Sequence, residues 1–200
     1  METTLYLVRH GETEYNVQAR LQGWCDSPLT VGGLDGVRRT AERLQAHRFT
    51  AAYVSTSPRA LATATALLAH HPHLPVREVP DLREFGFGRM EGAREVDLLP
   101  DVDPYEMWVG IATGTFAGFP DGETGATFRH RVLRAFRAIE AAHPGQDVLV
   151  VSHCLTLMTY FASIDPSITD VPRNAGVSVV EVGAGRRIRS LDARPPVAVG

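Results

Sequence analysis

An arginine and a histidine stand side by side, as Arg9 and His10, where the apolar segment 5–8 gives way to a glycine. A fixed guanidinium can hold a phosphate through forked hydrogen bonds, and a neutral imidazole beside it can attack the phosphorus. A histidine that follows a buried strand can also be a structural residue, so this pair by itself leaves both readings open. Phosphoryl chemistry is predicted only if further cations and an acid converge on the pair.

Such partners follow the other predicted strands. Each of three residues comes shortly after a predicted strand: Arg59 after 51–55, Glu84 after 76–79 and His153 after 148–152. In an open α/β sheet, ligands bind outside the carboxyl ends of the strands. We therefore expect these side chains to meet Arg9 and His10 at one edge of a sheet.

Each of these residue types has a part in phosphoryl transfer. His10 would attack and form a phosphohistidine, with its other ring nitrogen held by a hydrogen bond to a group such as a backbone carbonyl. Arg9 and Arg59 would each give forked hydrogen bonds to the phosphoryl oxygens, and His153 would add one more. Glu84 would protonate the leaving alkoxide and then activate water.

Two alternatives concern the acid and the metal. Glu84 could instead pair with Arg83 or Arg89 on the surface, which would leave the reaction without this acid. Two guanidiniums and two imidazoles can supply the positive charge that a metal ion would bring, so we expect neither a metal nor a cofactor.

The hydrophobic pattern predicts an α/β fold with a mostly parallel sheet, because short apolar strands alternate with helices. Helices are predicted at about 34–47, 58–70, 123–142 and 155–162, and closing strands at 176–182 and 187–191. A glycine-containing loop is expected at 10–30 and a loose tail after Asp192. Residues 1–200 are expected to form one domain, in which an insertion at about 93–122, with one or two short helices, covers the site.

Composition narrows the classes of function. The chain has 200 residues, 44% hydrophobic and 22% charged, with a net charge of −3, so neither nucleic acid nor an anionic membrane is an expected partner. No apolar run is long enough to span a membrane and no signal pattern opens the chain, which predicts a cytoplasmic protein. All twenty basic residues are arginine, which excludes Schiff-base and P-loop lysines. Two cysteines give no disulfide framework.

Several segments carry a resemblance to a known family. In chain order they are Leu-Val-Arg-His-Gly-Glu-Thr at 7–13, Arg-Leu-Gln-Gly-Trp-Cys-Asp-Ser-Pro-Leu-Thr at 20–30, Ser-Thr-Ser-Pro-Arg-Ala at 55–60, Leu-Arg-Glu-Phe-Gly-Phe-Gly-Arg-Met-Glu-Gly at 82–92, Gly-Glu-Thr at 122–124 with Arg131, and Val-Val-Ser-His at 150–153. They resemble the histidine phosphatase superfamily, the phosphoglycerate mutase-like proteins, over about residues 3–182.

The resemblance implies a three-layer α/β/α sandwich and a metal-independent phosphohistidine mechanism. By matched position, His10 is the nucleophile and Glu84 the proton donor. The phosphate pocket is implied to consist of Arg9, Arg59 and His153, with Asn16, Gln22 and Gly23 lining it.

Two departures from the family bear on the reaction. Cys154 stands where the family usually has glycine. True phosphoglycerate mutases are longer and carry an arginine-rich segment, whereas residues 93–106 here are acidic, with Arg94 as the one cation. We therefore favour a phosphomonoesterase that acts on small phosphorylated metabolites and releases phosphate. A phosphoglycerate mutase and a catalytically silent phosphate-binding or interaction module are the alternatives, and a homodimer is left open.

Overall fold

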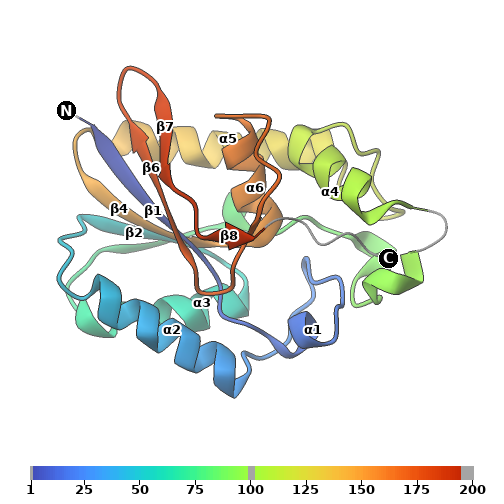
Figure 1. The fold of residues 1–200 in the computed structure, drawn as a ribbon, viewed down its shortest axis with the longest axis horizontal. Coiled ribbons are helices and arrows are strands. Elements are labelled where there is room, and N and C mark those ends of the chain that lie inside the picture. The colour runs from blue at the N-terminus through green and yellow to red at the C-terminus, as the bar shows by residue number, and fades with distance from the viewer. Residues whose placement is uncertain (1, 99–101, 195–200) are drawn as a thin grey trace.

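A six-stranded mixed sheet forms the centre of the protein (Figure 1). The computed structural model describes residues 2–98 and 102–194. In chain order the strands of this sheet are β1 (Thr3–Arg9), β2 (Ala51–Ser55), β3 (Val76–Val79), β4 (Asp147–Ser152), β6 (Val177–Val182) and β7 (Arg186–Ser190). In space the order is β3-β2-β4-β1-β6-β7. The first four strands run parallel, β6 runs antiparallel to β1, and β7 antiparallel to β6. The predicted α/β class with a mostly parallel sheet is confirmed.

Helices cover both faces of the sheet. The α-helices are α1 (Glu14–Val17), α2 (Val31–Leu44), α3 (Pro58–Leu67), α4 (Pro104–Thr113), α5 (Gly125–Ala142) and α6 (Cys154–Ala162). In Figure 1, α2 and α3 lie below the sheet, and α5 and α6 lie on the opposite side, where α4 packs against them. Short 3₁₀ turns occur at Leu68–His70, Pro80–Leu82, Gly88–Met90 and Glu95–Leu98. The result is the expected three-layer sandwich.

The alternation of side chains along the strands explains the two layers. In a strand, successive side chains point to opposite faces of the sheet. Leu7 and Val150 belong to the core between the sheet and α5 and α6. Their neighbours Val8 and Val151 belong to the core between the sheet and α2 and α3. The strands bury apolar side chains on both faces of the sheet, so the register of the sheet is fixed from two sides.

Three local predictions are corrected by the structure. The first long helix runs over Val31–Leu44 instead of 34–47, because Thr30 caps it by accepting a hydrogen bond from the N–H of Gly33 at 2.8 Å. The segment 10–30 contains α1, which begins at a capping box between Thr13 and Asn16.

The third correction concerns the chain after Asp192. Ala193–Arg194 forms strand β8, which pairs antiparallel with β5 (Val171–Pro172), so these two residues are not a loose tail. Residues 195–200 lie outside the described residues. No described helix is long and apolar enough to cross a membrane.

Candidate active site

Strand register brings the two histidines to one level of the sheet. In the parallel β1–β4 ladder, Arg9 pairs with Ser152, so His10 and His153 leave neighbouring strands side by side. Their ring centroids lie 5.2 Å apart. The expectation that residues following parallel strands meet at one edge therefore holds for this pair.

The His10 ring is held in one orientation by its own loop. Nδ1 lies 2.8 Å from the carbonyl oxygen of Gly11. Because a carbonyl only accepts, Nδ1 carries the proton and Nε2 carries the lone pair. Burial, followed by the charges of Arg59 and Arg9, holds the pKa of His10 well below its usual range. A neutral ring with a free lone pair on Nε2 is the form that a nucleophile needs.

His153 is placed at the start of α6, where it occupies the N-cap position. Its Nε2 lies 2.7 Å from the hydroxyl oxygen of Ser55, the last residue of β2. When that hydroxyl donates to Nε2, the proton of the neutral ring sits on Nδ1 and can be given to a ligand. Burial, and next the charge of Arg59, lowers the pKa of His153. Sequence reasoning assigned no role to Ser55, although its position at a strand end beside Arg59 was a signal.

Arg59 is tied to the loop that follows α1. Its Nη1 donates to the carbonyl of Cys25 at 3.1 Å and to the carboxylate of Asp26 at 3.0 Å. Its Nη2 donates to the carbonyls of Gln22 and Gly23 at 3.0 and 2.9 Å. In this structure the four terminal N–H groups thus donate to the protein, so the expected fork toward phosphate stays a prediction. Only Nε is left to meet an anion.

Arg9 is anchored in a similar way from the other side. Its Nη1 donates to the carbonyl of Pro172, in β5, at 2.8 Å. The Nε of Arg9, the Nε of Arg59 and the Nδ1 of His153 are all buried, and none has a hydrogen-bond partner within the described part of the chain. Buried polar groups are almost always paired in native proteins. Three such nitrogens beside His10 therefore indicate a site for an acceptor with several oxygens, such as phosphate.

Glu84 reaches the same region from the loop after β3. Its side chain is buried, with 5% of the residue exposed. Its carboxylate accepts hydrogen bonds from the backbone N–H groups of Phe85, Leu155 and Thr156 at 3.0, 3.0 and 3.2 Å. Burial raises the pKa of this carboxyl, against the opposing effect of the N–H groups of Leu155 and Phe85 and of the charge of Arg59. A carboxyl whose protonated form is favoured is suited to act as a general acid.

The surface alternative for Glu84 is excluded by these contacts. Arg89 pairs with Asp121 at 2.6 Å, and the Arg83 guanidinium lies over the ring of Trp24, 4.5 Å from its centroid. Neither arginine holds the carboxylate of Glu84.

Gln22 and Gly23 form part of the wall around Arg59. Besides offering their carbonyls to Arg59, they are held in place themselves. The side-chain oxygen of Gln22 accepts from the hydroxyl of Thr13 at 2.7 Å, and its amide donates to Ser27 at 3.0 Å. The N–H of Gly23 donates to Glu91 at 3.1 Å. These contacts show how the two residues fix the loop, whereas a contact with substrate stays a prediction.

Asn16 is linked to the backbone of His10 by a second asparagine, Asn174. The side-chain oxygen of Asn16 accepts from the N–H of Thr13 and from the side-chain amide of Asn174, both at 3.1 Å. Asn174 also donates to the carbonyl of His10 at 3.1 Å. Sequence reasoning missed Asn174, which stands more than 150 residues along the chain from Asn16 and belongs to no local motif.

Glu91 is another residue whose role the sequence did not reveal. Its carboxylate accepts from the N–H groups of Gly23, Trp24 and Cys25 at 3.1, 2.8 and 3.1 Å, and from that of Phe87 at 2.9 Å. One carboxylate therefore shapes the loop that holds Arg59. The signal available was its place in the segment 82–92.

The comparisons with known proteins identify the family of this chain. The sequence pattern of the histidine phosphatase superfamily (branch 1) matches residues 5–191, and the chain belongs to this family. The probable phosphoglycerate mutase GpmB of Enterobacter sp. (strain 638) is 37% identical over 155 residues, which cover 76% of this chain and 70% of that protein. The adenosylcobalamin/alpha-ribazole phosphatase of Escherichia coli (strain K12) is 32% identical over 150 residues, covering 74% and 72%.

Among solved structures, YhfR of Bacillus stearothermophilus is 33% identical to this chain. The superposition covers 95% of this chain and 96% of the YhfR chain, with a TM-score of 0.83. The similar proteins thus include one named as a probable mutase and one named as a phosphatase. Membership of the family therefore does not decide between these two reactions.

Proposed function

We propose that this protein is a metal-independent phosphomonoesterase that acts on small phosphorylated metabolites through a phosphohistidine on His10. The observation that carries the proposal is the set of three buried, unpartnered nitrogens on Arg9, Arg59 and His153 within the described residues. They stand beside a histidine whose Nδ1 is held by Gly11 and whose Nε2 therefore has the lone pair. A phosphoryl group has enough peripheral oxygens to accept from all three nitrogens.

In the first step, Nε2 of His10 attacks the phosphorus, and the bond from phosphorus to the substrate oxygen breaks. Glu84 gives its proton to the leaving oxygen, so the product alcohol departs neutral. The cationic N–H groups of Arg9 and Arg59, with His153, stabilise the charge on the phosphoryl oxygens.

In the second step, water attacks the phosphohistidine and Glu84, now ionised, takes its proton. The bond between phosphorus and Nε2 breaks, which returns His10 to its neutral form and releases inorganic phosphate. The burial that raises the pKa of Glu84 favours its return to the protonated state for the next cycle.

A mutase is the second candidate, favoured by the likeness to GpmB. A mutase would need cations for a second phosphate or a carboxylate on the substrate. In the acidic segment 93–106, the lone cation Arg94 donates from Nε and Nη2 to the carboxylate of Asp97, at 3.1 and 2.8 Å. This pairing leaves the segment poorly suited to a second anion and supports the phosphatase. Substrate cover by the insertion 93–122, a cytoplasmic location and a homodimer stay predictions.

The two candidates differ in the fate of the phosphoryl group. We expect release of inorganic phosphate from a panel of sugar phosphates, phosphoglycerates, nucleotides and phosphoamino acids. Phosphoglycerates should give phosphate in preference to isomerisation, with and without bisphosphoglycerate. Isomerisation faster than phosphate release would establish the mutase instead, and a protein inert toward the whole panel would support the silent binding module.

A further inference from the structure

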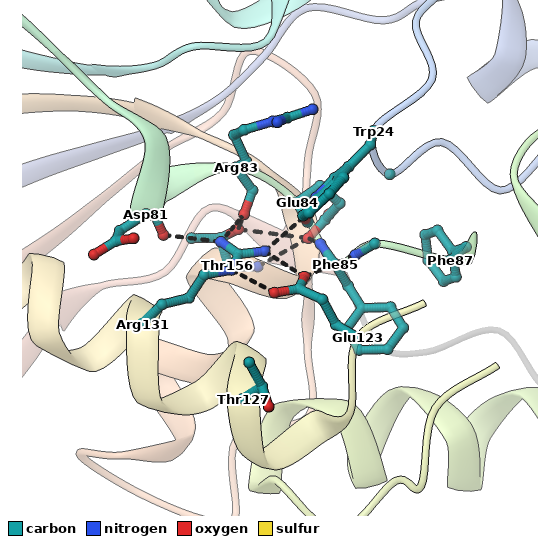
Figure 2. Close-up of polar contacts among 12 residues, drawn as sticks. Trp24, Asp81, Arg83, Glu84, Phe85, Phe87, Glu123, Thr127, Arg131 and Thr156 are labelled. Atoms are coloured by element: carbon teal, nitrogen blue, oxygen red, sulfur yellow. Dashed lines mark hydrogen bonds and ion pairs between the residues drawn. The ribbon is translucent and has the colours of Figure 1, made fainter. Parts of the chain in front are cut away.

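One guanidinium on α5 makes three of the hydrogen bonds that hold the loop carrying Glu84 (Figure 2). Nη1 of Arg131 donates to the backbone carbonyls of Asp81 and Arg83 at 3.0 and 2.7 Å. Nη2 donates to the carbonyl of Glu84 itself at 2.8 Å. Three carbonyls within four residues thus point at one side chain, which fixes the path of the backbone at Glu84.

Glu123 holds Arg131 in the orientation that this contact requires. Its two carboxylate oxygens accept from Nε and Nη2 of Arg131 at 2.7 and 2.6 Å. Both side chains are largely buried, with 12% and 11% exposed. Together with the three carbonyls, this pair occupies all five N–H groups of the guanidinium.

Glu123 also holds the loop directly, on the far side of Glu84. Its carboxylate accepts from the N–H of Gly86 at 2.9 Å, and its own N–H donates to the carbonyl of Gly86 at 2.9 Å. The ion pair of Glu123 and Arg131 therefore contacts the backbone before Glu84 and at Glu84, as Figure 2 shows. Through Glu123 it also contacts the backbone after Glu84, at Gly86.

The carboxyl group of Glu84 is fixed by a different helix. It accepts from the N–H groups of Leu155 and Thr156, at the start of α6. Arg131 on α5 thus holds the backbone carbonyl of Glu84, to which Nε1 of Trp24 also donates at 3.1 Å. The carboxyl of Glu84 is held in part by α6, the helix whose N-cap is His153. The position of the acid relative to the phosphate pocket depends on both attachments.

We propose that Arg131, oriented by Glu123, is a positioning residue for proton transfer by Glu84, an inference that rests on the proposed function. Arg131 does not touch the reacting atoms. It holds the acid where a leaving oxygen can receive the proton, and a shift of about 1 Å in such a group can cost about 100-fold in rate.

This role makes the effect of losing Arg131 depend on the leaving group. A substrate with a weakly basic leaving group departs without help from an acid, whereas a more basic leaving group needs the proton. p-Nitrophenyl phosphate and phenyl phosphate differ in this respect and share the phenyl phosphate framework, apart from the para nitro group. A purely structural role for Arg131 would slow both substrates equally.

The experiment compares kcat/KM for these two substrates in the parent, Arg131→Lys and Glu84→Gln. We expect Arg131→Lys to lose about tenfold more activity on phenyl phosphate than on p-nitrophenyl phosphate, in the direction of the larger selectivity of Glu84→Gln. Arg134→Ala is the matched control. Arg134 lies on the same helix and pairs with the side chain of Asp81 at 2.7 Å, largely exposed, so both substrates should keep their parental rates.

Equal losses on both substrates, or none, in Arg131→Lys would overturn the positioning role while Glu84→Gln remained selective. A Glu84→Gln protein without leaving-group selectivity would overturn the proposed acid, and this inference with it. Thermal unfolding shows whether Arg131→Lys is folded. If it is not, Glu123→Gln answers the same question, because its amide cannot hold Arg131 through two anionic oxygens, and the same selectivity is required of it.

Discussion

Arg59, which is buried, and Arg131, which is largely buried, both donate to loop carbonyls but differ in how many of their N–H groups are occupied. Arg59 gives its four terminal N–H groups to the loop 22–26 and keeps Nε without a partner in the described structure. Arg131 gives all five N–H groups to Glu123 and to the loop 81–84. Both organise a loop through its carbonyl groups, but only Arg59 retains a donor.

The remaining donor distinguishes an arginine that can bind a ligand from one that only positions other groups. A buried charged donor without a partner is costly, so it is retained where a ligand will accept from it. A saturated guanidinium has no hydrogen left for a ligand and can act only through the groups it holds. By this criterion, we assign Arg59 to the proposed phosphate pocket and Arg131 to the support of that pocket.

The largest expected loss of activity is that of Arg59→Met, which removes the arginine whose Nε is unpartnered among the described residues. It removes a donor to phosphate and leaves the carbonyls of Gln22, Gly23 and Cys25 without their partner. We expect kcat/KM to fall about 1,000-fold on any phosphomonoester, since the loss of one donor to a developing charge costs about that much. Steady-state kinetics measure the change. Arg59→Lys, which keeps the charge without Nε, should not restore the rate, and a rate above a tenth of the parent's would show that Nε is not used.

The next prediction concerns pH. The attack needs His10 neutral, so kcat/KM for phenyl phosphate should rise with pH through the pKa of His10, which lies below its usual 6.5. The proton transfer needs Glu84 protonated, so kcat/KM should fall as pH rises through the pKa of Glu84, which lies above its usual 4.5.

Glu84→Gln should therefore lose the fall at higher pH and keep the rise at lower pH. Its maximal kcat/KM for phenyl phosphate should be about 100-fold lower, the lower range for loss of a general acid. A pH–rate profile of both proteins gives the answer. A Gln variant that still loses activity as pH rises would assign that limb to another group.

The smallest expected effect concerns the contact between the loop that contains Gly23 and the loop that contains Phe85 and Glu91. A Cβ atom on Gly23 would collide with the carbonyl oxygen of Phe85 and crowd the carboxylate of Glu91. Gly23→Ala should therefore push the two loops apart and lower the free energy of unfolding by about 1–3 kcal/mol. Chemical denaturation measures it, with Gly185→Ala as the control, since a Cβ there meets nothing within 4 Å. Equal stability of the two variants would mean that the loops are not in firm contact.

The sequence predicted the sheet and the meeting of its strand ends because both depend on local patterns. Apolar runs mark the buried strands, and parallel strands bring the residues that follow them to one edge. His10 and His153 could be paired on this basis alone. The contact of His10 with a carbonyl was also expected, since the ring of a nucleophilic histidine must be held.

What the sequence did not predict depends on long-range contacts. Arg59 meets carbonyls more than 30 residues away, so its occupied terminal nitrogens could not be foreseen from its own segment. Arg131 stands on a helix whose pattern marks only the apolar face, and nothing local says that its guanidinium turns to a loop almost 50 residues earlier. The short helix α1 was not predicted because it has only 4 residues, too few to show a helical hydrophobic pattern.

The central claim is that His10 carries the phosphoryl group. The most direct measurement mixes the Glu84→Gln protein with p-nitrophenyl phosphate, stops the reaction with denaturant under alkaline conditions, and locates the phosphoryl group by mass spectrometry. Glu84→Gln should be phosphorylated readily and hydrolysed slowly, so an acid-labile phosphohistidine should accumulate on His10 and be absent from His10→Ala. A phosphoryl group on another residue, or a His10→Ala protein as active as the parent, would contradict the account.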